Sequence, residues 1–388
     1  MQNVSEEETS LTSELCAYVA GEIARAGGWI GFERFMQMAL YQPGLGYYAK
    51  HSRKFGAMPS SGSDFVTAPE MSPLFGRCLA VQVEEAMAQS GVREIWEFGA
   101  GSGALARQLL QGLGERVQRY VIVEVSAALR QRQRESLVEF AGRVEWIDSL
   151  PERIEAIVLG NEVLDAMPVT LLARVKGQWH ERGVTLDPNA DAVNAAGAPN
   201  PPGAPVFIWS DRPTALRPPV QIEGVHDYLT EIHPQAEAFM RTLAERLKRG
   251  AAFFIDYGFP EHEYYHPQRA QGTLMCHRGH RVDSRPLADV GLKDITAHVN
   301  FSAMALAAQD AGLDCLGYTS QGRFLLNGGI APMLRDATLA ERTHALRLVN
   351  EHEMGELFKV LGLAPRAENG ARPWQALGFA EGERSHTL

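Results

Sequence analysis

The sequence lacks the features that mark secreted and membrane-spanning proteins. Its 388 residues include only four cysteines and no C-x-x-C pair, so we expect a reducing compartment rather than a disulfide scaffold. No apolar run approaches the roughly 18 residues that a membrane span requires. The first ten residues carry three glutamates and neither Lys nor Arg, unlike secretory or mitochondrial targeting peptides. These absences predict a cytoplasmic protein, or a mitochondrial matrix protein only if the chain is a processed form.

Positive charge is also scarce. The chain has 37 Lys and Arg residues against 47 Asp and Glu residues, which gives a formal net charge of −10. Proteins that bind nucleic acid or anionic membranes generally present a basic surface. We therefore expect neither a nucleic-acid partner nor membrane insertion, whereas an oligomer remains compatible with the sequence. Hydrophobic residues make up 45% and charged residues 22%, the proportions of an ordinary globular protein.

From residue 94 onward, short apolar runs alternate with helical stretches. We expect strands at 94–98, 120–125, 144–147, 154–159, 251–257 and 313–319, and helices at 103–113, 127–139, 234–249 and 301–311. Helical spacing also marks 12–40 and 72–89. Strands that alternate with helices form βαβ units. The predicted fold class is therefore α/β, a mostly parallel, doubly wound sheet of Rossmann-like type with an N-terminal helical extension and inserted elements on the substrate side.

The chain is longer than one such sheet requires. We expect an N-terminal helical or lid region at 1–85 and a larger domain at 86–388. Two insertions interrupt the larger domain. The first, 169–232, combines a hairpin pattern with an Ala/Asn/Gly/Pro-rich stretch at 187–205 that predicts a mobile loop, and the second, 258–300, is rich in His and Arg.

A glycine-rich loop lies between the first expected strand and its helix. It reads Glu97-Phe98-Gly99-Ala100-Gly101-Ser102-Gly103. Glycines permit a tight turn and a close approach of backbone N–H groups to a ligand. Glu124, at the end of the next strand, can accept hydrogen bonds from both hydroxyls of a ribose. The loop fits two cofactors, since G-x-G-x-x-A is a dinucleotide pattern and E-x-G-x-G-x-G is typical of S-adenosylmethionine enzymes.

Two acids favour S-adenosylmethionine. Glu97 can hold the cationic methionine moiety directly or through water, and Asp148, after the third strand, can accept a hydrogen bond from the adenine amino group. Thr67 and Pro69 either cover the cofactor pocket or belong to a loop that caps the helix beginning near Ser72. The expected cofactor-binding residues are Glu97, Gly99, Ala100, Gly101, Ser102, Gly103, Glu124, Val125, Asp148, Ser149, Asn161, Thr67 and Pro69.

Several longer motifs resemble those of a known family. They are Tyr41-Gln42-Pro43-x-x-Gly46-Tyr47-Tyr48, the segment 64–76 (DFVTAPEMSPLFG), the glycine loop, the segment 160–169 (GNEVLDAMPV), Ile255-Asp256-Tyr257-Gly258, Gly272-Thr273-Leu274 and the segment 294–299 (DITAHV). Over about residues 30 to 330 the chain resembles the MidA family of S-adenosylmethionine-dependent methyltransferases. The resemblance implies a class I methyltransferase fold and S-adenosylhomocysteine as product. Mitochondrial members are assembly factors that methylate an arginine of a complex I (NADH dehydrogenase) subunit, which implies a protein substrate of this kind. His277 and Asn300 depart from the family pattern, where tyrosine and aspartate are expected.

Three carboxylates are the candidate catalytic residues. Glu162 and Asp165 follow the fourth expected strand, and Asp256 ends the fifth. Because the carboxyl ends of parallel strands meet at one edge of a sheet, these acids are expected near the acceptor. Together they can hold a guanidinium group bidentately and take the proton lost on methylation. The alternative is that each acid is an ordinary helix cap, an alternative that weighs most for Asp256.

Other functions stay open on the sequence. They are methyl transfer to a small molecule or another protein residue, a chaperone that binds S-adenosylmethionine during assembly, and an NAD(P)-dependent oxidoreductase. Cys276-His277-x-x-His280 has a spacing that zinc ligands can adopt, but Arg278 and Arg281 interleave with it and would repel a cation. We expect no metal there.

Overall fold

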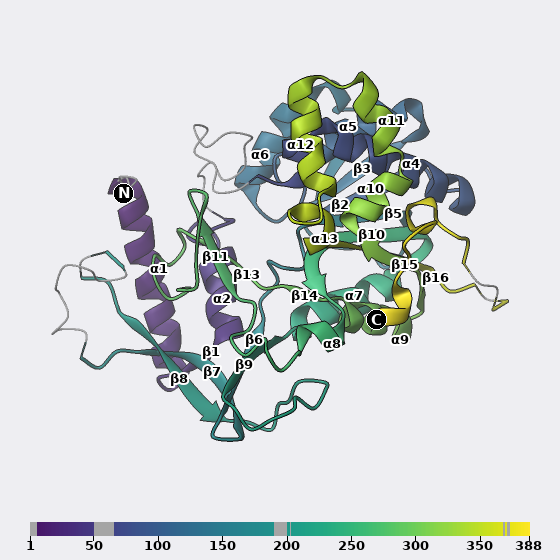
Figure 1. Cartoon of the computed structure of the whole chain (residues 1–388). Helices are drawn as coiled ribbons and strands as arrows, with labels where there is room; N and C mark the ends of the chain where they lie inside the picture. Colours follow the sequence, from purple (N-terminus) through teal and green to yellow (C-terminus); the bar gives the residue numbers. More distant parts are fainter. Residues whose placement is uncertain (1–5, 50–65, 190–199, 202, 368, 371–372) are drawn as a thin grey trace. The chain divides into compact units, whose positions relative to one another are not determined.

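The computed structural model describes residues 6–49, 66–189, 200–201, 203–367, 369–370 and 373–388. The chain divides into two compact units, each assembled from three stretches. Unit 1 comprises Met1–Ser52, Ala166–Gln235 and His262–Ala297, and unit 2 comprises Arg53–Asp165, Ala236–Glu261 and His298–Leu388. Figure 1 labels their helices and strands. Most of the mobile loop expected over 187–205, and residues 64–65 of the motif at 64–76, lie outside the described residues.

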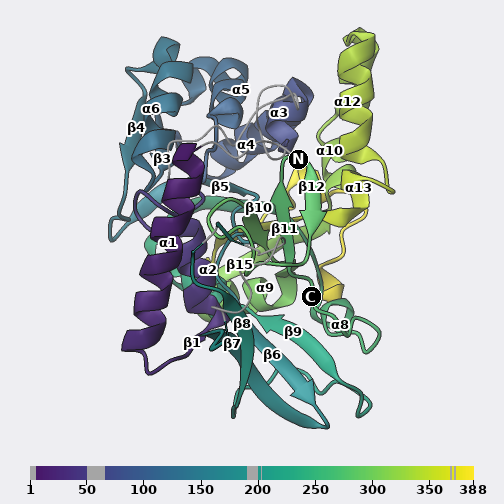
Figure 2. The ribbon, with the colours of Figure 1, turned by 90° about the vertical axis from the view of Figure 1, so that its left-hand side faces the viewer.

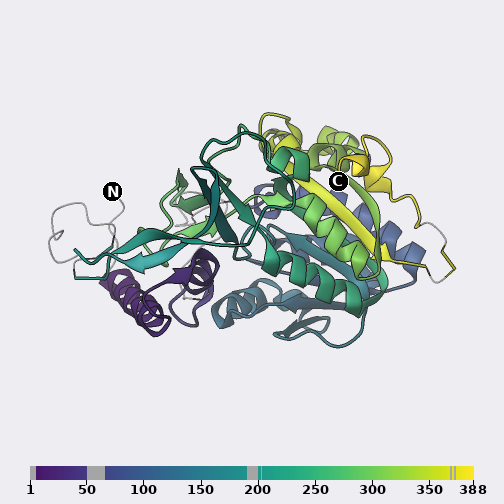
Figure 3. The same ribbon diagram turned by 90° about the horizontal axis from the view of Figure 1, so that it is seen from below.

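Unit 2 is built on one central sheet whose strand order is β4-β3-β2-β5-β10-β16-β15. The strands are β2 (Glu94–Phe98), β3 (Arg119–Val123), β4 (Val144–Ile147), β5 (Ile154–Asn161), β10 (Leu247–Phe259), β15 (Leu313–Ser320) and β16 (Phe358–Pro365). The first five strands in this order pair in parallel, and β16 lies antiparallel between β10 and β15 (Figure 3). The short strand β14 (Val299–Asn300) adds to β10 in parallel.

Helices cover both faces of this sheet. The helices α4 (Pro73–Ser90) and α5 (Ala104–Leu113) bury residues such as Val83 and Leu109 in a core that includes Ile95 of β2. On the other face, Phe239 of α7 (Pro234–Arg246) meets Phe98 with 5.0 Å between the ring centroids. A central parallel strand covered on both faces is expected to be apolar where it is buried, as β5 is from residue 156 to residue 160 (AIVLG). The predicted α/β, doubly wound, mainly parallel fold is confirmed.

The remaining helices of unit 2 were only partly expected. They are α3 (Ala68–Met71), α6 (Ala127–Ser136), α9 (Phe301–Asp310), α10 (Gln321–Asn327), α11 (Ile330–Asp336), α12 (Leu339–Val349) and α13 (Met354–Leu357), with 3-10 turns at Gly114–Arg116, Val138–Phe140, Leu377–Phe379 and Ser385–Thr387. No helix or strand was predicted beyond residue 319, so α10 to α13 and β16 are additions to the predicted fold.

Unit 1 has a smaller antiparallel sheet and two N-terminal helices. The helices α1 (Glu6–Arg25) and α2 (Phe32–Tyr41) lie side by side, separated in sequence by the short strand β1 (Ile30–Gly31) (Figures 1 and 2). The sheet contains β1, β6 (Thr170–Val175), β7 (Gln178–Leu186), β8 (Phe207–Pro213) and β9 (Tyr228–Ile232), and a separate three-stranded sheet contains β11 (Met275–Arg278), β12 (Arg281–Asp283) and β13 (Asp294–Thr296). The helix α8 (Glu261–Tyr264) begins at the boundary between the units.

The boundary expected at residue 85 falls inside a helix. The helix α4 spans it and belongs to unit 2, because its apolar face packs into the core of the central sheet. Residues 1–52 share unit 1 with most of the two predicted insertions, 169–232 and 258–300. Among the described residues, no helix has both the length and the apolar composition that would let it cross a membrane.

Candidate functional site

The glycine loop joins β2 to α5 with three glycines in the left-handed region. Gly99, Gly101 and Gly103 have φ angles of 63°, 52° and 81°. At Gly99 a side chain is excluded for a second reason, since a Cβ atom would lie 2.9 Å from Cγ2 of Val163. Val163 belongs to the turn after β5 that carries Glu162. The glycine loop and this turn therefore lie against each other at one edge of the sheet.

Gln133 on α6 hydrogen-bonds to the backbone of the glycine loop. Its Nε2 donates to the carbonyl oxygen of Gly101 at 3.0 Å and to Oε2 of Glu124 at 3.3 Å, and its Oε1 accepts from Nε1 of Trp146 at 2.9 Å. The side chain is fully buried. Nothing in the local sequence marked this residue, because its role depends on how α6 packs.

Glu124 lies where the sequence placed a ribose-binding acid. It is buried at the end of β3, and its Oε1 accepts from the backbone N–H of Ser126 at 2.8 Å. Burial raises the pKa of this carboxyl, and the hydrogen bonds from Ser126 and Gln133 oppose that rise. A carboxylate has about four acceptor positions, so Glu124 keeps acceptor capacity for a ribose hydroxyl. The next residue, Val125, is 71% exposed.

Asp148 and Ser149 are adjacent in sequence but have different surroundings. Asp148 is exposed and forms an ion pair with Arg130 at 3.5 Å, and Arg130 also donates from Nε to the carbonyl oxygen of Glu124 at 2.6 Å. Asp148 is therefore linked to the Glu124 end of the predicted cofactor site. Ser149 instead lines a cavity on the face of the sheet.

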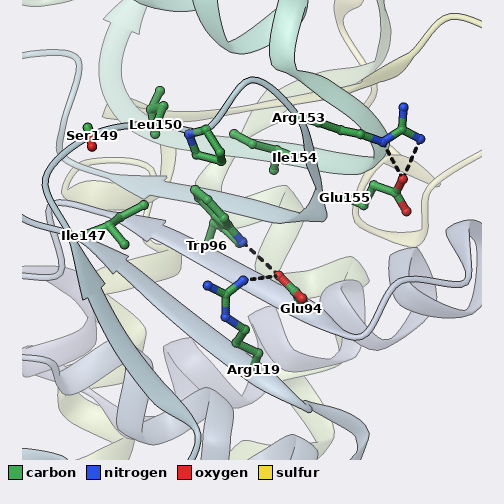
Figure 4. A pocket seen from close by; sticks show the side chains of 10 residues that line it. Glu94, Trp96, Arg119, Ile147, Ser149, Leu150, Arg153, Ile154 and Glu155 are labelled. Carbon is green, nitrogen blue, oxygen red and sulfur yellow. Dashed lines mark hydrogen bonds and ion pairs between the residues drawn. The ribbon is translucent and has the colours of Figure 1, made fainter.

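That cavity has a volume of about 610 Å³ and is a different place from the glycine loop (Figure 4). It exists because residues 148–153 run from β4 to β5 without forming a helix. Its lining residues are Glu94, Trp96, Arg119, Ile147, Ser149, Leu150, Pro151, Arg153, Ile154 and Glu155. Two ion pairs, Glu94 with Arg119 and Arg153 with Glu155, neutralise the charges around it. No residue of the glycine loop or of the Glu162 turn lines it.

Glu97 is buried rather than presented to solvent. The Tyr120 hydroxyl donates to its Oε2 at 2.7 Å. Burial raises the pKa of Glu97 to about 7, and the hydrogen bond from Tyr120 opposes the shift. The carboxyl is therefore divided between its neutral and ionised forms near neutral pH, a state that a neighbouring cation would shift toward ionised.

The turn after β5 carries the predicted catalytic acids. Glu162 adopts φ 54°, which is rare for a non-glycine residue, and its backbone N–H donates to the carbonyl oxygen of Ile255 at 2.9 Å. The Asn161 side chain donates to Oε1 of Glu162 at 3.1 Å. Burial, followed by the negative charge of Asp165, raises the pKa of Glu162 to about 8.

Asp256 lies close to Glu162 and Asp165, but its carboxylate binds backbone groups of the turn. Its Oδ2 accepts from the backbone N–H groups of Val163, Leu164 and Asp165 at 3.2, 3.0 and 3.2 Å. Burial and the negative charges of Asp165 and Glu162 raise its pKa well above the ordinary value. The structure therefore brings the three acids together, and Asp256 anchors the turn that carries the other two.

Thr67 and Pro69 lie next to Glu162. Thr67 precedes α3, and Pro69 is buried within it. The backbone of Ala68, between them, hydrogen-bonds to the Glu162 carboxyl. The sequence left two alternatives for this segment: it covers the cofactor pocket, or it caps the helix that begins near Ser72. In the structure Ser72 itself caps α4, and the segment contacts the turn that carries Glu162.

These residues fit S-adenosylmethionine. In addition to the glycine loop and Glu124, the Oδ1 atom of Asn161 is buried with no hydrogen-bond partner among the described residues, and it can accept from the amino group of a methionine moiety. The ribose would lie at Glu124 and the adenine near Asp148 and Val125.

The two residues that depart from the family pattern, Asn300 and His277, both lie in regular secondary structure or cap it. Asn300 caps α9, its Oδ1 accepting from the backbone N–H of Ala303 at 3.2 Å, a role that needs an acceptor oxygen and no charge. His277 lies in β11, and burial lowers its pKa. Within the described ranges, no group of three or more His, Cys, Asp or Glu side chains could hold a metal ion.

Comparison with known proteins places the chain in a family. Residues 75–319 match the family described as "Putative S-adenosyl-L-methionine-dependent methyltransferase". The relative "Protein arginine methyltransferase NDUFAF7, mitochondrial" from Danio rerio is 29% identical over 94% of this chain and 90% of its own length. Its homolog from Caenorhabditis elegans is 25% identical over 92% and 87%.

A solved structure agrees over the whole chain. A "likely methyl transferase" from Burkholderia thailandensis, bound to S-adenosyl-homocysteine, is 46% identical, covers 100% of both chains and superposes with a TM-score of 0.90. An identity of this size supports both the fold and the cofactor class. With the glycine loop, Glu124 and Asn161 arranged as described, the chain belongs to this family of S-adenosyl-L-methionine-dependent methyltransferases.

Proposed function

We propose that this protein methylates an arginine side chain of a protein, and that the acceptor belongs to respiratory complex I. The observation that carries the proposal is the pair of carboxylates Glu162 and Asp165, in a turn that lies against the glycine loop. Two relatives named as protein arginine methyltransferases support the acceptor type. The complex I subunit is inferred from the family resemblance of the motifs, and the site of action is then the cytoplasm, or the mitochondrial matrix if the chain is a processed form.

The proposed chemistry needs little beyond positioning and a proton acceptor. Bound S-adenosylmethionine supplies an activated methyl group on its sulfonium sulfur. Glu162 and Asp165 hold the planar guanidinium and orient one nitrogen. That nitrogen must lose a proton when it gains the methyl group. Glu162, with a pKa of about 8, is matched to accept this proton near neutral pH.

The experiment that tests the proposal is labelling with isotopic S-adenosylmethionine. The protein is incubated with labelled cofactor and a lysate of its own cells, and labelled bands are hydrolysed to amino acids. We expect a labelled protein whose hydrolysate contains methylated arginine. Label in another amino acid, in a small molecule only, or in nothing would contradict the proposal and favour, respectively, another protein methyltransferase, a small-molecule methyltransferase or an assembly chaperone.

Glu162→Gln tests the assignment of the catalytic acid. The amide keeps the size of the side chain but cannot take up a proton, so we expect methyl transfer to fall by about 100-fold or more while the affinity for S-adenosylhomocysteine stays within about twofold. In the wild type, kcat/KM should rise with pH toward about 8, because the ionised form of Glu162 is the active one.

The matched control for this variant is Glu152→Gln, an exposed glutamate just before β5. It should match the wild type in rate and pH profile. Loss of cofactor binding together with activity in Glu162→Gln would assign Glu162 to the cofactor site instead.

A further inference from the structure

Gln108 on α5 fastens the junction of α3 and α4. Its Nε2 donates to the carbonyl oxygen of Pro69 at 2.7 Å, and its Oε1 accepts from the backbone N–H of Gly76 at 3.1 Å. One amide therefore satisfies a backbone acceptor in α3 and a backbone donor in α4. Both are groups at or near helix ends, which lack partners within their own helices.

The contact between Gln108 and the backbone of residue 76 requires a glycine at that position. A Cβ atom there would overlap Oε1 and Cβ of Gln108. Both groups belong to a half-buried, helix-borne side chain with little room to withdraw. The absence of a side chain at Gly76 therefore sets how closely α4 approaches α5, and with it the position of α3.

The helix α3 in turn contacts the acceptor side of the site. The Ala68 backbone hydrogen-bonds to the Glu162 carboxyl, and the charge of Glu70 is close enough to act on the same group. The backbone of Glu162 already occupies a strained left-handed conformation. Two neighbours outside the turn therefore hold Glu162: the Ala68 backbone on α3 bonds to its side chain, and the carbonyl oxygen of Ile255 on β10 accepts from its backbone N–H.

We propose that Gln108 is a positioning residue for methyl transfer, which aligns the Glu162 carboxylate with the bound cofactor. The connection runs from the glycine loop through α5, which begins directly after Gly103, to Gln108, then to the Pro69 carbonyl group and the Ala68 backbone. Through it, one helix fixes the cofactor loop and the acceptor carboxylate relative to each other. The inference rests on the proposed role of Glu162 as the acceptor-binding acid.

The first test is Gln108→Leu, which keeps the shape of the side chain and removes both hydrogen bonds. We expect kcat for methyl transfer to an arginine acceptor to fall by about tenfold, because small misplacements of a reacting group are costly. The dissociation constant for S-adenosylhomocysteine should change by less than about twofold, because the glycine loop keeps its own hydrogen bond to Gln133. The matched control is Gln111→Leu, which changes an exposed residue on the same helix.

A second readout does not depend on the acceptor. The carboxyl groups of glutamate are labelled with ¹³C, and the Glu162 signal is assigned by its loss in Glu162→Gln. A hydrogen bond from a backbone N–H stabilises a carboxylate, so loosening α3 should move the titration midpoint of Glu162 to higher pH in Gln108→Leu. The control variant should titrate as the wild type does. A merely structural role of Gln108 in the core would leave this midpoint unchanged.

Two further variants separate the possible outcomes. Gln108→Glu keeps an acceptor for Gly76 but loses the donor to Pro69, and Gly76→Ala displaces Gln108 without removing it, so both should reproduce the effect of Gln108→Leu. An unmoved Glu162 midpoint, or an equal loss of kcat and cofactor affinity, overturns the positioning role. If arginine transfer is absent in the wild type but the midpoint still moves, the proposed function fails while the link from Gln108 to Glu162 stands.

Discussion

At the scale of single residues, the predicted cofactor side of the site depends on a side chain that the sequence did not mark. Gln133 joins the glycine loop, Glu124 and β4 through one buried amide. Removing a buried amide that uses its donors and its acceptor costs more free energy than removing an exposed one. Its buried partners are left without a hydrogen bond and without water to replace it.

Replacing Gln133 with Leu should therefore weaken cofactor binding. We expect the dissociation constant for S-adenosylhomocysteine to rise by about tenfold, the equivalent of one to two hydrogen bonds. Isothermal titration calorimetry measures it directly. Gln131→Leu, an exposed change on the same helix, serves as the control and should bind normally. Equal affinities in the two variants would show that the loop keeps its conformation without Gln133.

The sequence pointed to candidate ligand-facing residues, which stay predictions, but it did not point to the residues that support them. The glycine loop and Glu124 are placed by local rules, since a strand end, a tight turn and the next strand end are adjacent in any βαβ unit. Gln133 and Gln108 act through helix packing, and neither their spacing nor their neighbours in sequence show which backbone group a distant amide will meet. Asp256 was expected beside the acceptor, and the structure shows its Oδ2 committed to the turn and its Oδ1 accepting from the backbone N–H of Tyr257.

At the scale of elements, the acidic turn is held by its neighbouring strand. Three backbone N–H groups of residues 163–165 share one oxygen of Asp256, which ends β10. The turn therefore depends on the pairing of β5 with β10. This dependence explains how a non-glycine residue can be kept at φ 54°, since the surrounding bonds determine the conformation more strongly than the local preference does.

Asp256→Leu should destabilise the protein by about 2 to 4 kcal/mol, because it leaves buried N–H groups without an acceptor. Asp256→Asn retains an acceptor oxygen and relieves charge repulsion, so its loss should be smaller. Urea unfolding measures both free energies, and Asp336→Asn, an exposed change at the end of α11, provides the baseline. A leucine variant as stable as the asparagine variant would show that water replaces the lost acceptor.

The predicted strands and helices were those with a clear local pattern. The runs at β2, β3, β4, β5, β10 and β15 are bounded by turn residues and alternate with amphipathic helices, and the structure confirms them. The strand β16 was not predicted, because eight residues of mixed character, FKVLGLAP, give no periodicity that separates a strand from a helix. Its place between β10 and β15 is a long-range pairing that no local pattern encodes.

At the scale of the whole molecule, buried acids link stability to pH. Glu97 and Glu162 have pKa values of about 7 and about 8, and burial also raises the pKa values of Glu231 and Asp256. Between the ordinary pKa of a carboxyl and these raised values, the folded state binds more protons than the unfolded state. The free energy of unfolding must therefore fall as the pH rises through this range.

We expect the unliganded protein to lose stability between about pH 5 and pH 8, with Glu97 contributing up to about 3 kcal/mol of that change. Thermal or urea unfolding at several pH values tests this. Glu97→Gln should flatten the curve over this range, whereas Glu115→Gln, an exposed change, should leave its slope intact. A curve of equal slope in both variants would show that Glu97 stays ionised in the folded protein.

The position of β16 also has a consequence for how the protein is made. The strand that fills the gap between β10 and β15 follows every other strand of this sheet in the sequence, so it leaves the ribosome after them. Until then, β10 and β15 cannot be joined and both present open edges, which are templates for pairing with other chains. A nascent or prematurely terminated chain that ends before residue 358 would hold the glycine loop and the acidic turn on an unfinished sheet. The ribosome must therefore make the chain through β16 before the central sheet of unit 2 can close, and until then the protein is most exposed to aggregation and to capture by chaperones.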